Sequence, residues 1–263
     1  MAYVYAVLHN GNGDFIICRK NEKGYFFHNK SGTGGSIYPN GVTLNGGGFY
    51  SFPGGTPDVP GVVDGAREEL EEEMAIEVGT GNLNPAYYNG GKYYGVYFSI
   101  GKGYADTLQQ AKEHLAHGQA AALAVADGTY TQSSQYEAML EAFNICPQDN
   151  ELNGPESWNV FYDRDKIEAL NKVPTDWFYR IIMNLSAQLF PCRVYDVSGR
   201  LVGMAQGMAE IDGPQFILRY ILFDPVLLTT SGVYKIVYMG WSYAGLTMEA
   251  TPLRGGVAAF KVG

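Results

Sequence analysis

Residues 68–73 read Glu-Glu-Leu-Glu-Glu-Glu and place five carboxylates within six positions of the chain. Successive residues of an α-helix are rotated by ~100°, so Glu69 and Glu73 share one edge, with Glu72 further round toward water. Carboxylates at this spacing repel one another, and a bound Mg²⁺ or Mn²⁺ would relieve the repulsion. Hard cations take oxygen ligands, and Mg²⁺ commonly joins one or two carboxylates to substrate phosphates. The run is compatible with a divalent-cation site for a small phosphorylated substrate, although a glutamate-rich helix by itself is more typical of a solvated face.

Apolar residues at helical spacing predict that this segment is a helix. Val63, Ala66, Leu70 and Met74 fall on one stripe of such a helix. Leu70 is therefore expected to face the core, with the glutamates along the edge of the buried stripe.

A glycine turn precedes the helix, because residues 52–55 read Phe-Pro-Gly-Gly. Glycine has no side chain to obstruct the site, so the backbone at this turn can approach it closely. Turn and helix together resemble the Nudix box, G-x5-E-x7-R-E-U-x-E-E-x-G-U, in which U is apolar. The matching residues are Gly54 for the first Gly, Glu69-Leu70 for E-U, Glu72-Glu73 for E-E, and Ile76 for the last U.

Three positions depart from the box. Pro60 stands where the box has its first Glu, Glu68 where it has Arg, and Ala75 where it has the second Gly. A register shifted by one residue recovers Arg67 but puts a glutamate in the apolar slot, so the apolar stripe favours the unshifted register. In that register, Arg67 is rotated away from the carboxylate that the arginine of the family orients.

The resemblance implies an α+β fold, a Nudix-type α/β/α sandwich with a mixed sheet. It also implies a metal-dependent hydrolase that cleaves the pyrophosphate of a nucleoside diphosphate linked to another moiety, with Mg²⁺ or Mn²⁺ as cofactor. In the family, the positions of Glu72 and Glu73 bind the metal, and that of Glu69 binds metal or activates water. The catalytic candidates are Glu69, Glu72, Glu73 and the displaced Arg67. The substrate-binding candidates are Gly54, Gly55, Phe52, Tyr93 and Tyr94.

Two further features of the family concern residues outside the box: an additional carboxylate and a tyrosine that marks one branch. A carboxylate outside the box often contributes in the family, and Glu151 or Glu156 is the candidate here. A tyrosine near the positions of Tyr93 and Tyr94 marks the diadenosine-polyphosphate branch, but tyrosine is too frequent in this chain to choose that branch.

The departures leave two alternatives open. A degenerate box would belong to a Nudix-fold module that binds a nucleotide or a protein partner without hydrolysis. A retained activity on a non-nucleotide substrate would make the chain an enzyme for a prenyl or sugar diphosphate.

The elements around the box are read from local patterns. Residues 3–8 and 14–19 are expected to form strands joined by the Asn-Gly-Asn-Gly turn of residues 10–13. The glycine-rich residues 31–48 are expected to form a long turn or substrate-side loop, followed by strands at 49–52 and 92–100.

Helical spacing recurs in residues 105–145, which predicts a helical insertion at about 103–148. His114 and His117 lie there at i and i+3, a spacing that would allow metal binding, but with no third ligand nearby a polar helix surface is favoured. A closing strand at 158–162 and helices at 165–170 and 175–182 would complete a Nudix-like domain of residues 1–190. Residues 191–263 read as a small β-rich domain or extension for substrate selection or contact in a homodimer.

Composition limits the partners. The chain has 263 residues, a net charge of −9 and a pI near 4.9, which argues against binding a nucleic-acid polymer. Its three cysteines are odd in number and widely spaced, so buried, inert thiols are expected. No basic leader and no apolar run of ~18 residues is present, which predicts a cytoplasmic protein without membrane contact.

Overall fold

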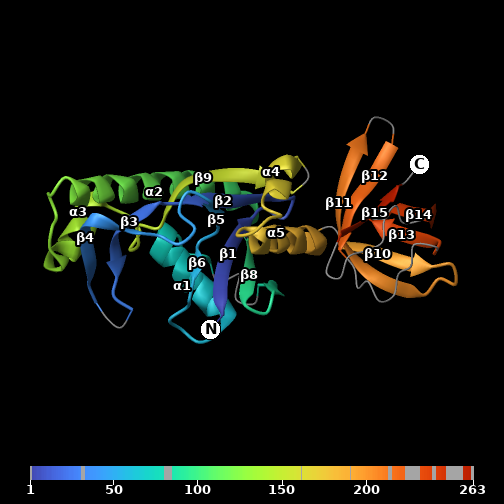
Figure 1. Ribbon diagram of the computed structural model, residues 1–263, viewed down its shortest axis with the longest axis horizontal. Helices are drawn as coiled ribbons and strands as arrows, with labels where there is room; N and C mark the ends of the chain where they lie inside the picture. Colours follow the sequence, from blue (N-terminus) through green and yellow to red (C-terminus); the bar gives the residue numbers. More distant parts are fainter. Residues whose placement is uncertain are drawn as a thin grey trace. The chain divides into compact units, whose positions relative to one another are not determined.

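The structure is a computed structural model in which the helices lie between an N-terminal and a C-terminal run of strands along the chain (Figure 1). It describes residues 2–30, 33–79, 85–160, 162–189, 191–212, 215–222, 232–238, 241–246 and 257–261. The helices are α1 (Val62–Met74), α2 (Tyr104–Ala126), α3 (Tyr136–Phe143), α4 (Arg164–Ala169) and α5 (Asp176–Leu189), with 3₁₀ helices η2 (Gly101–Gly103) and η3 (Ser133–Gln135). The first nine strands are β1 (Tyr3–His9), β2 (Asp14–Lys20), β3 (Lys23–His28), β4 (Gly35–Thr43), β5 (Tyr50–Ser51), β6 (Gly54–Gly55), β7 (Tyr87–Asn89), β8 (Tyr93–Ser99) and β9 (Leu152–Asn159).

A seven-stranded mixed sheet holds the glycine turn and the strands around it. Its main path is β5-β2-β1-β8-β7, with β6 also pairing with β1 and β9 with β2. β1 and β8 are parallel, whereas β1 pairs antiparallel with β2 and with β6. The predicted hairpin of β1 and β2 and the predicted strand β8 are confirmed, as is the α+β class with a mixed sheet.

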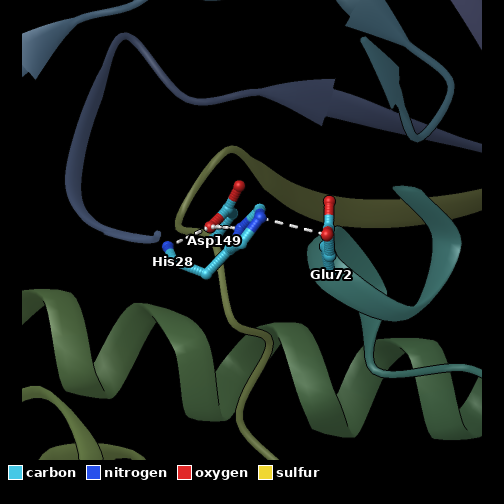
Figure 2. Close-up of side chains that lie close together, drawn as sticks. All are labelled: His28, Glu72 and Asp149. Atoms are coloured by element: carbon cyan, nitrogen blue, oxygen red, sulfur yellow. Dashed lines mark hydrogen bonds and ion pairs between the residues drawn. The ribbon is translucent and has the colours of Figure 1, made fainter. Parts of the chain in front are cut away.

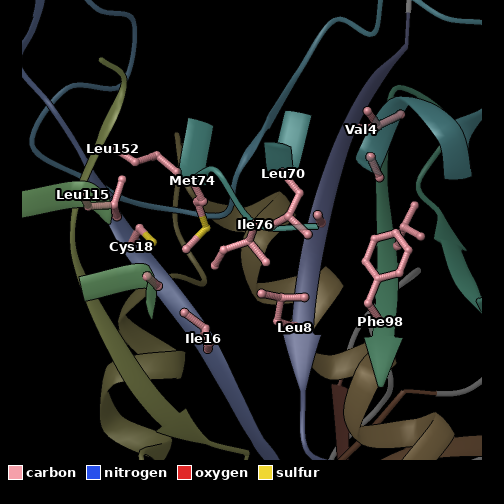
Figure 3. Close-up of a cluster of buried hydrophobic side chains, with 14 residues drawn as sticks. Val4, Leu8, Ile16, Cys18, Leu70, Met74, Ile76, Phe98, Leu115 and Leu152 are labelled. Carbon is pink, nitrogen blue, oxygen red and sulfur yellow. The ribbon is translucent and has the colours of Figure 1, made fainter. Parts of the chain in front are cut away.

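One face of this sheet packs on α1 and α2 (Figure 3). Leu70 and Met74 of α1 are fully buried against Val4 and Leu8 of β1 and Phe98 of β8. The predicted inward position of Leu70 is therefore confirmed, and this packing fixes how α1 is rotated about its own axis.

Aromatic rings occupy the other face. Phe178 makes edge contacts with Tyr5 of β1, at 5.0 Å between ring centroids, and with Phe52, at 5.8 Å. Phe52 in turn packs against Phe15 of β2. The predicted helix start near residue 175 is confirmed, since α5 begins at Asp176.

The expectation of a loop at 31–48 is wrong in its central part. β3 and β4 form an antiparallel hairpin in which His28 pairs with Gly35 and Lys23 with Thr43. A side chain at Gly35 would have its Cβ 2.4 Å from the ring of Tyr136 in α3, so glycine is needed where the helix meets the hairpin. The glycines here permit close packing and do not break the strand.

The predicted helical region is confirmed as α2 and α3. These helices and the β3–β4 hairpin enclose a second apolar cluster that includes Phe26, Ile37, Val125 and Met139. The closing strand, expected at 158–162, starts earlier and runs through β9 from Leu152. Pairing with β2 sets this start, which local residue preferences at 152–157 do not reveal.

Contacts divide the chain into two units, one of residues 1–158 and 170–178, the other of residues 159–169 and 179–263. The second unit contains a six-stranded sheet in the order β14-β13-β10-β11-β12-β15, with every pair antiparallel. Its strands are β10 (Pro191–Asp196), β11 (Leu201–Asp212), β12 (Gln215–Leu222), β13 (Tyr234–Tyr238), β14 (Trp241–Leu246) and β15 (Val257–Lys261). The elements described after residue 190 are strands, whereas a domain boundary at residue 190 and the role of this region stay predictions.

Two further findings concern the described residues as a whole. None of their helices has both the length and the apolar character needed to span a membrane. Cys18 and Cys146 are buried free thiols, as expected.

Candidate metal and active site

The glutamates of α1 line a cavity of about 320 Å³. Burial of the Leu70 stripe brings Glu69 and Glu73, on its edge, to only 8% and 2% exposure. Glu72 lies further round, with a side chain that is 16% exposed. All three carboxylates line the cavity, but in the described part of the chain their oxygens do not all lie within 4.8 Å of one another.

The glycine turn lies directly against two of these carboxylates. The backbone N–H of Gly54 donates to Glu73 Oε2 at 2.8 Å. A Cβ at Gly55 would lie 2.9 Å from Glu69 Oε1 and 3.1 Å from Oε2, so the missing side chain makes room for that carboxylate. Gly54 and Gly55 therefore form one wall of the cavity, in contact with the box helix.

Helix α1 ends at Ala75 in a backbone conformation that favours glycine. Ala75 is in the left-handed conformation, with φ 53° and ψ 37°, and its N–H donates to carbonyl groups of the last helical turn. Glycine is the residue best suited to such a helix end. The chain thus keeps the backbone shape of this position while carrying alanine.

Residues 149–151, which precede β9, supply two more carboxylates, Asp149 and Glu151. Backbone hydrogen bonds hold this segment on three sides: Asp149 N–H to Glu72 O, Asn150 N–H to Phe26 O, and Asn21 N–H to Glu151 O. The segment is therefore fixed against α1 and the strands, and its carboxylates have defined positions.

Two lysines counter some of this negative charge. Lys20, at the end of β2, forms an ion pair of 2.6 Å with Glu151. Lys30 lies 2.9 Å from Asp58 and also lines the cavity. These cations give the cavity two groups that suit phosphate oxygens.

His28, the last residue of β3, lies between two carboxylates (Figure 2). Its Nδ1 is 2.9 Å from Asp149 Oδ1, and its Nε2 is 3.0 Å from Glu72 Oε1. The backbone N–H of His28 also donates to Asp149 Oδ1, at 2.7 Å. One ligand atom from each of these three residues lies within 4.8 Å of the others, as a metal site requires.

Burial raises the pKa of the three glutamates of α1 that line the cavity. Burial, then repulsion from Glu72 and Glu151, raises the pKa of Glu69 to about 8. Burial also raises the pKa of Glu72 to about 7, against the opposing effect of His28. The pKa of the fully buried Glu73 lies well above its ordinary value, for the same first reason. A divalent cation would stabilise the ionised forms, so this set of donors fits Mg²⁺ or Mn²⁺.

The hydrogen bond to Asp149 and the charges of Asp149, Glu72 and Asp58 raise the pKa of His28 to about 9. The imidazole is therefore positively charged at neutral pH when no metal is bound. It then partly neutralises the two carboxylates beside it.

A second cavity, of about 560 Å³, adjoins the first, because both are lined by Lys20, Gly54 and Gly55. Trp177 and Tyr93 stack there with ring centroids 4.7 Å apart and planes 14° from parallel. The further aromatic residues of the lining are Tyr3, Tyr5, Phe49, Tyr50 and Phe178. The glycine turn thus separates a carboxylate cavity from an aromatic one.

Of the substrate-binding candidates, Gly54, Gly55 and Tyr93 lie in these cavities. Tyr94 points to the opposite side of β8, where it packs on the apolar core over α1. Phe52 is fully buried among aromatic rings and lines neither cavity.

Arg67 and Glu156 also lie outside the carboxylate cavity. Arg67 forms an ion pair with Asp64 at 3.3 Å, and its guanidinium lies over the ring of Phe98. Glu156, within β9, accepts hydrogen bonds from Tyr50 and from the indole of Trp158. Between the two candidates for the extra carboxylate, only Glu151 lines the cavity with the box glutamates.

The two histidines of α2 are also apart from this cavity. Nδ1 of His114 is 3.1 Å from Met74 O, and the residue is 8% exposed, so its interpretation as helix surface is wrong. The stripe of α2 that packs on α1 includes this position. Nδ1 of His117 bonds to Asn144 O.

His28, Asp149, Lys20 and Lys30 are the site residues that sequence reasoning missed. They come from three separate segments and carry no shared spacing. The one available signal is that Lys20 and His28 each end a strand, where side chains can gather at a sheet edge.

Comparison with protein-family models, with curated proteins and with solved structures finds no match to this chain. The case for a function therefore rests on the residues and geometry of the site itself.

Proposed function

We propose that this protein is a Nudix-type, metal-dependent hydrolase that cleaves the pyrophosphate of a nucleoside diphosphate linked to another moiety. The observation that carries the proposal is the convergence of Glu69, Glu72 and Glu73 with the Gly54–Gly55 wall in one cavity. These are the residues that the Nudix-box resemblance assigns to metal binding and catalysis. The parallel β1–β8 pair and helices against one sheet face support the same fold family.

The neighbouring cavities support a substrate with two chemically different ends. Phosphates would lie in the carboxylate cavity, where Glu72 and Glu73 would hold Mg²⁺ or Mn²⁺ and Lys20 would bind phosphate oxygens. A bound metal would neutralise charge that develops on the phosphate oxygens during cleavage. The base would occupy the aromatic cavity, because planar rings pack well against tyrosine and tryptophan.

Glu69 is the candidate for activating water, and the resemblance also allows it as a metal ligand. It is buried, its carboxylate touches the glycine turn, and its pKa of about 8 suits a group that accepts a proton near neutral pH. Arg67 takes no part in this scheme, because its ion pair with Asp64 lies outside the cavity.

A module that binds without hydrolysis is the second candidate, favoured by the position of Arg67 and by Pro60. In this reading the same cavities hold a nucleotide ligand but no water is activated. A sugar or prenyl diphosphate substrate is the third; the aromatic cavity accepts apolar groups as well as bases.

Release of phosphate or nucleotide from a panel of diphosphates, with Mg²⁺ or Mn²⁺, tests the proposal. The panel contains ADP-ribose, diadenosine polyphosphates, nucleotide sugars, NADH, coenzyme A and a prenyl diphosphate. We expect turnover of a nucleotide compound that EDTA abolishes and that Glu72→Gln lowers by ~10²-fold or more. Glu71→Gln is the matched control, since Glu71 is on the same helix but exposed and outside the cavity. Absence of turnover from folded protein would favour the binding module.

A further inference from the structure

His28 differs from a histidine on the protein surface in two respects: its side chain is largely buried in the carboxylate cavity, and Asp149 holds it through two contacts. Its side chain is 14% exposed, and that of Asp149 is 13% exposed. Asp149 Oδ1 receives both the backbone N–H and the Nδ1 side of the same histidine, at 2.7 and 2.9 Å. The imidazole is therefore held by two contacts with one carboxylate oxygen, which leaves Nε2 directed at Glu72.

Such an arrangement is typical of a metal-binding histidine. Ligating imidazoles usually donate their second N–H to a carboxylate, which fixes the tautomer and the ring orientation. In the metal-free protein Nε2 is protonated and donates to Glu72. A metal ion would replace that proton, and Nε2 would then offer its lone pair beside the Glu72 oxygen while Nδ1–H still donates to Asp149. Two such acceptors at 3.0 Å attract each other only through a proton or a cation between them.

The separation of these two atoms suits neighbouring ligands of one metal ion. Neighbouring ligands in octahedral coordination, with metal–ligand bonds of ~2.1 Å, are ~3.0 Å apart. Nε2 of His28 and Oε1 of Glu72 have this separation. Glu69 and Glu73 line the same cavity and offer further oxygen ligands.

We propose that His28 Nε2 is a nitrogen ligand of the metal, beside Glu72, and that Asp149 positions the imidazole through Nδ1. The inference rests on the proposed metal-dependent function and adds a ligand that the box resemblance does not supply. Imidazole favours transition ions, whereas sites made of oxygen alone suit Mg²⁺. The site therefore selects Mn²⁺ or Co²⁺ over Mg²⁺ more strongly than a carboxylate site does.

Nitrogen hyperfine coupling in the electron spin-echo spectrum of Mn²⁺-loaded full-length protein tests the ligand directly. We expect coupling to ¹⁴N that changes to the ¹⁵N pattern when histidine alone is labelled, and that disappears in His28→Gln. His117→Gln, on α2 and bonded to Asn144 O, is the control and retains the coupling. The labelled native protein gives a decisive result even where the substitution at His28 prevents folding.

Metal affinities give an independent readout. His28→Gln offers an amide oxygen in place of nitrogen, so we expect Co²⁺ affinity to fall ~10- to 100-fold, with Mg²⁺ affinity changed less than ~3-fold. Asp149→Asn, which weakens the hold on Nδ1, is expected to lower Co²⁺ affinity in the same direction.

The outcomes separate this inference from the proposed function. EDTA-sensitive turnover with no histidine coupling would overturn the inference and leave the hydrolase intact. Histidine coupling without turnover of any diphosphate would support the ligand and refute hydrolysis. Equal losses of Co²⁺ and Mg²⁺ affinity in His28→Gln would also count against nitrogen ligation.

Discussion

Replacing Gly55 by alanine tests whether the Glu69 carboxylate must lie against the glycine turn. The added Cβ would lie 2.9 and 3.1 Å from the two oxygens of Glu69, whereas ordinary contacts begin at 3.4 Å. The backbone of Gly55 has no positive φ, so alanine fits the local conformation. The carboxylate is the far end of a flexible side chain, so it would retreat while the fold survives.

The size of the effect follows from that retreat. The carboxylate must move by ~0.5 Å, and a displacement of ~1 Å in a catalytic site costs ~10²-fold in rate. We therefore expect Gly55→Ala to lower kcat/KM by ~10- to 100-fold, equivalent to ~1.4–2.7 kcal/mol. The melting temperature of the metal-free protein should change by less than ~2 °C.

Steady-state hydrolysis of the preferred diphosphate measures the rate, and the rise in melting temperature on adding Mn²⁺ measures the metal site. Gly103→Ala is the control, because a Cβ there meets no atom within 4 Å and its φ is −75°. In a Glu69→Ala background the obstructed carboxylate is gone, so Gly55→Ala should then have little further effect on the Mn²⁺-induced rise. Wild-type kcat/KM in Gly55→Ala, or an equal loss in both backgrounds, would refute the reasoning.

Four further predictions address metal affinity, the pH dependence of stability, substrate binding and the end of helix α1. Glu69 and Glu72 must ionise to bind metal, and their pKa values of about 8 and 7 imply that Mn²⁺ affinity rises between about pH 6 and 9; affinity that is flat over this range in a Mn²⁺ titration would contradict this. The pKa values of Glu69, Glu72 and His28 are all higher in the folded protein than in an unfolded chain, so the folded state keeps protons that the unfolded state has lost. The free energy of unfolding of the metal-free protein, measured with urea, should therefore fall as the pH rises toward 9. Trp177→Ala, which removes a ring stacked at 4.7 Å in the aromatic cavity, should raise KM by ~2- to 12-fold with kcat nearly unchanged, and a loss in kcat alone would exclude a binding role. Ala75→Gly, at φ 53°, should stabilise the protein by ~1 kcal/mol in thermal unfolding, and a lower melting temperature would show that this position tolerates alanine without strain.

Local patterns predicted the elements whose residues repeat with a regular period. α1 was predicted with its buried face because Leu70 and Met74 recur at helical spacing, and β1 and β2 because a strong turn sequence lies between two apolar runs. The β4 strand was missed because its glycines, read locally, indicate a loop, whereas pairing with β3 and the approach of Tyr136 determine the strand.

The sequence by itself determined which helix carries the carboxylates and which face of that helix is buried. Apolar residues at helical spacing fix the buried face, and the glutamates then lie along the edge of that face. It also determined the glycine turn beside them. Only the tertiary structure decided that His28, Asp149 and Lys20 join this cavity. The physical reason is that these side chains are brought together by strand pairing and by long-range backbone hydrogen bonds, such as Asp149 N–H to Glu72 O. Contacts between distant segments leave no periodic pattern in the chain.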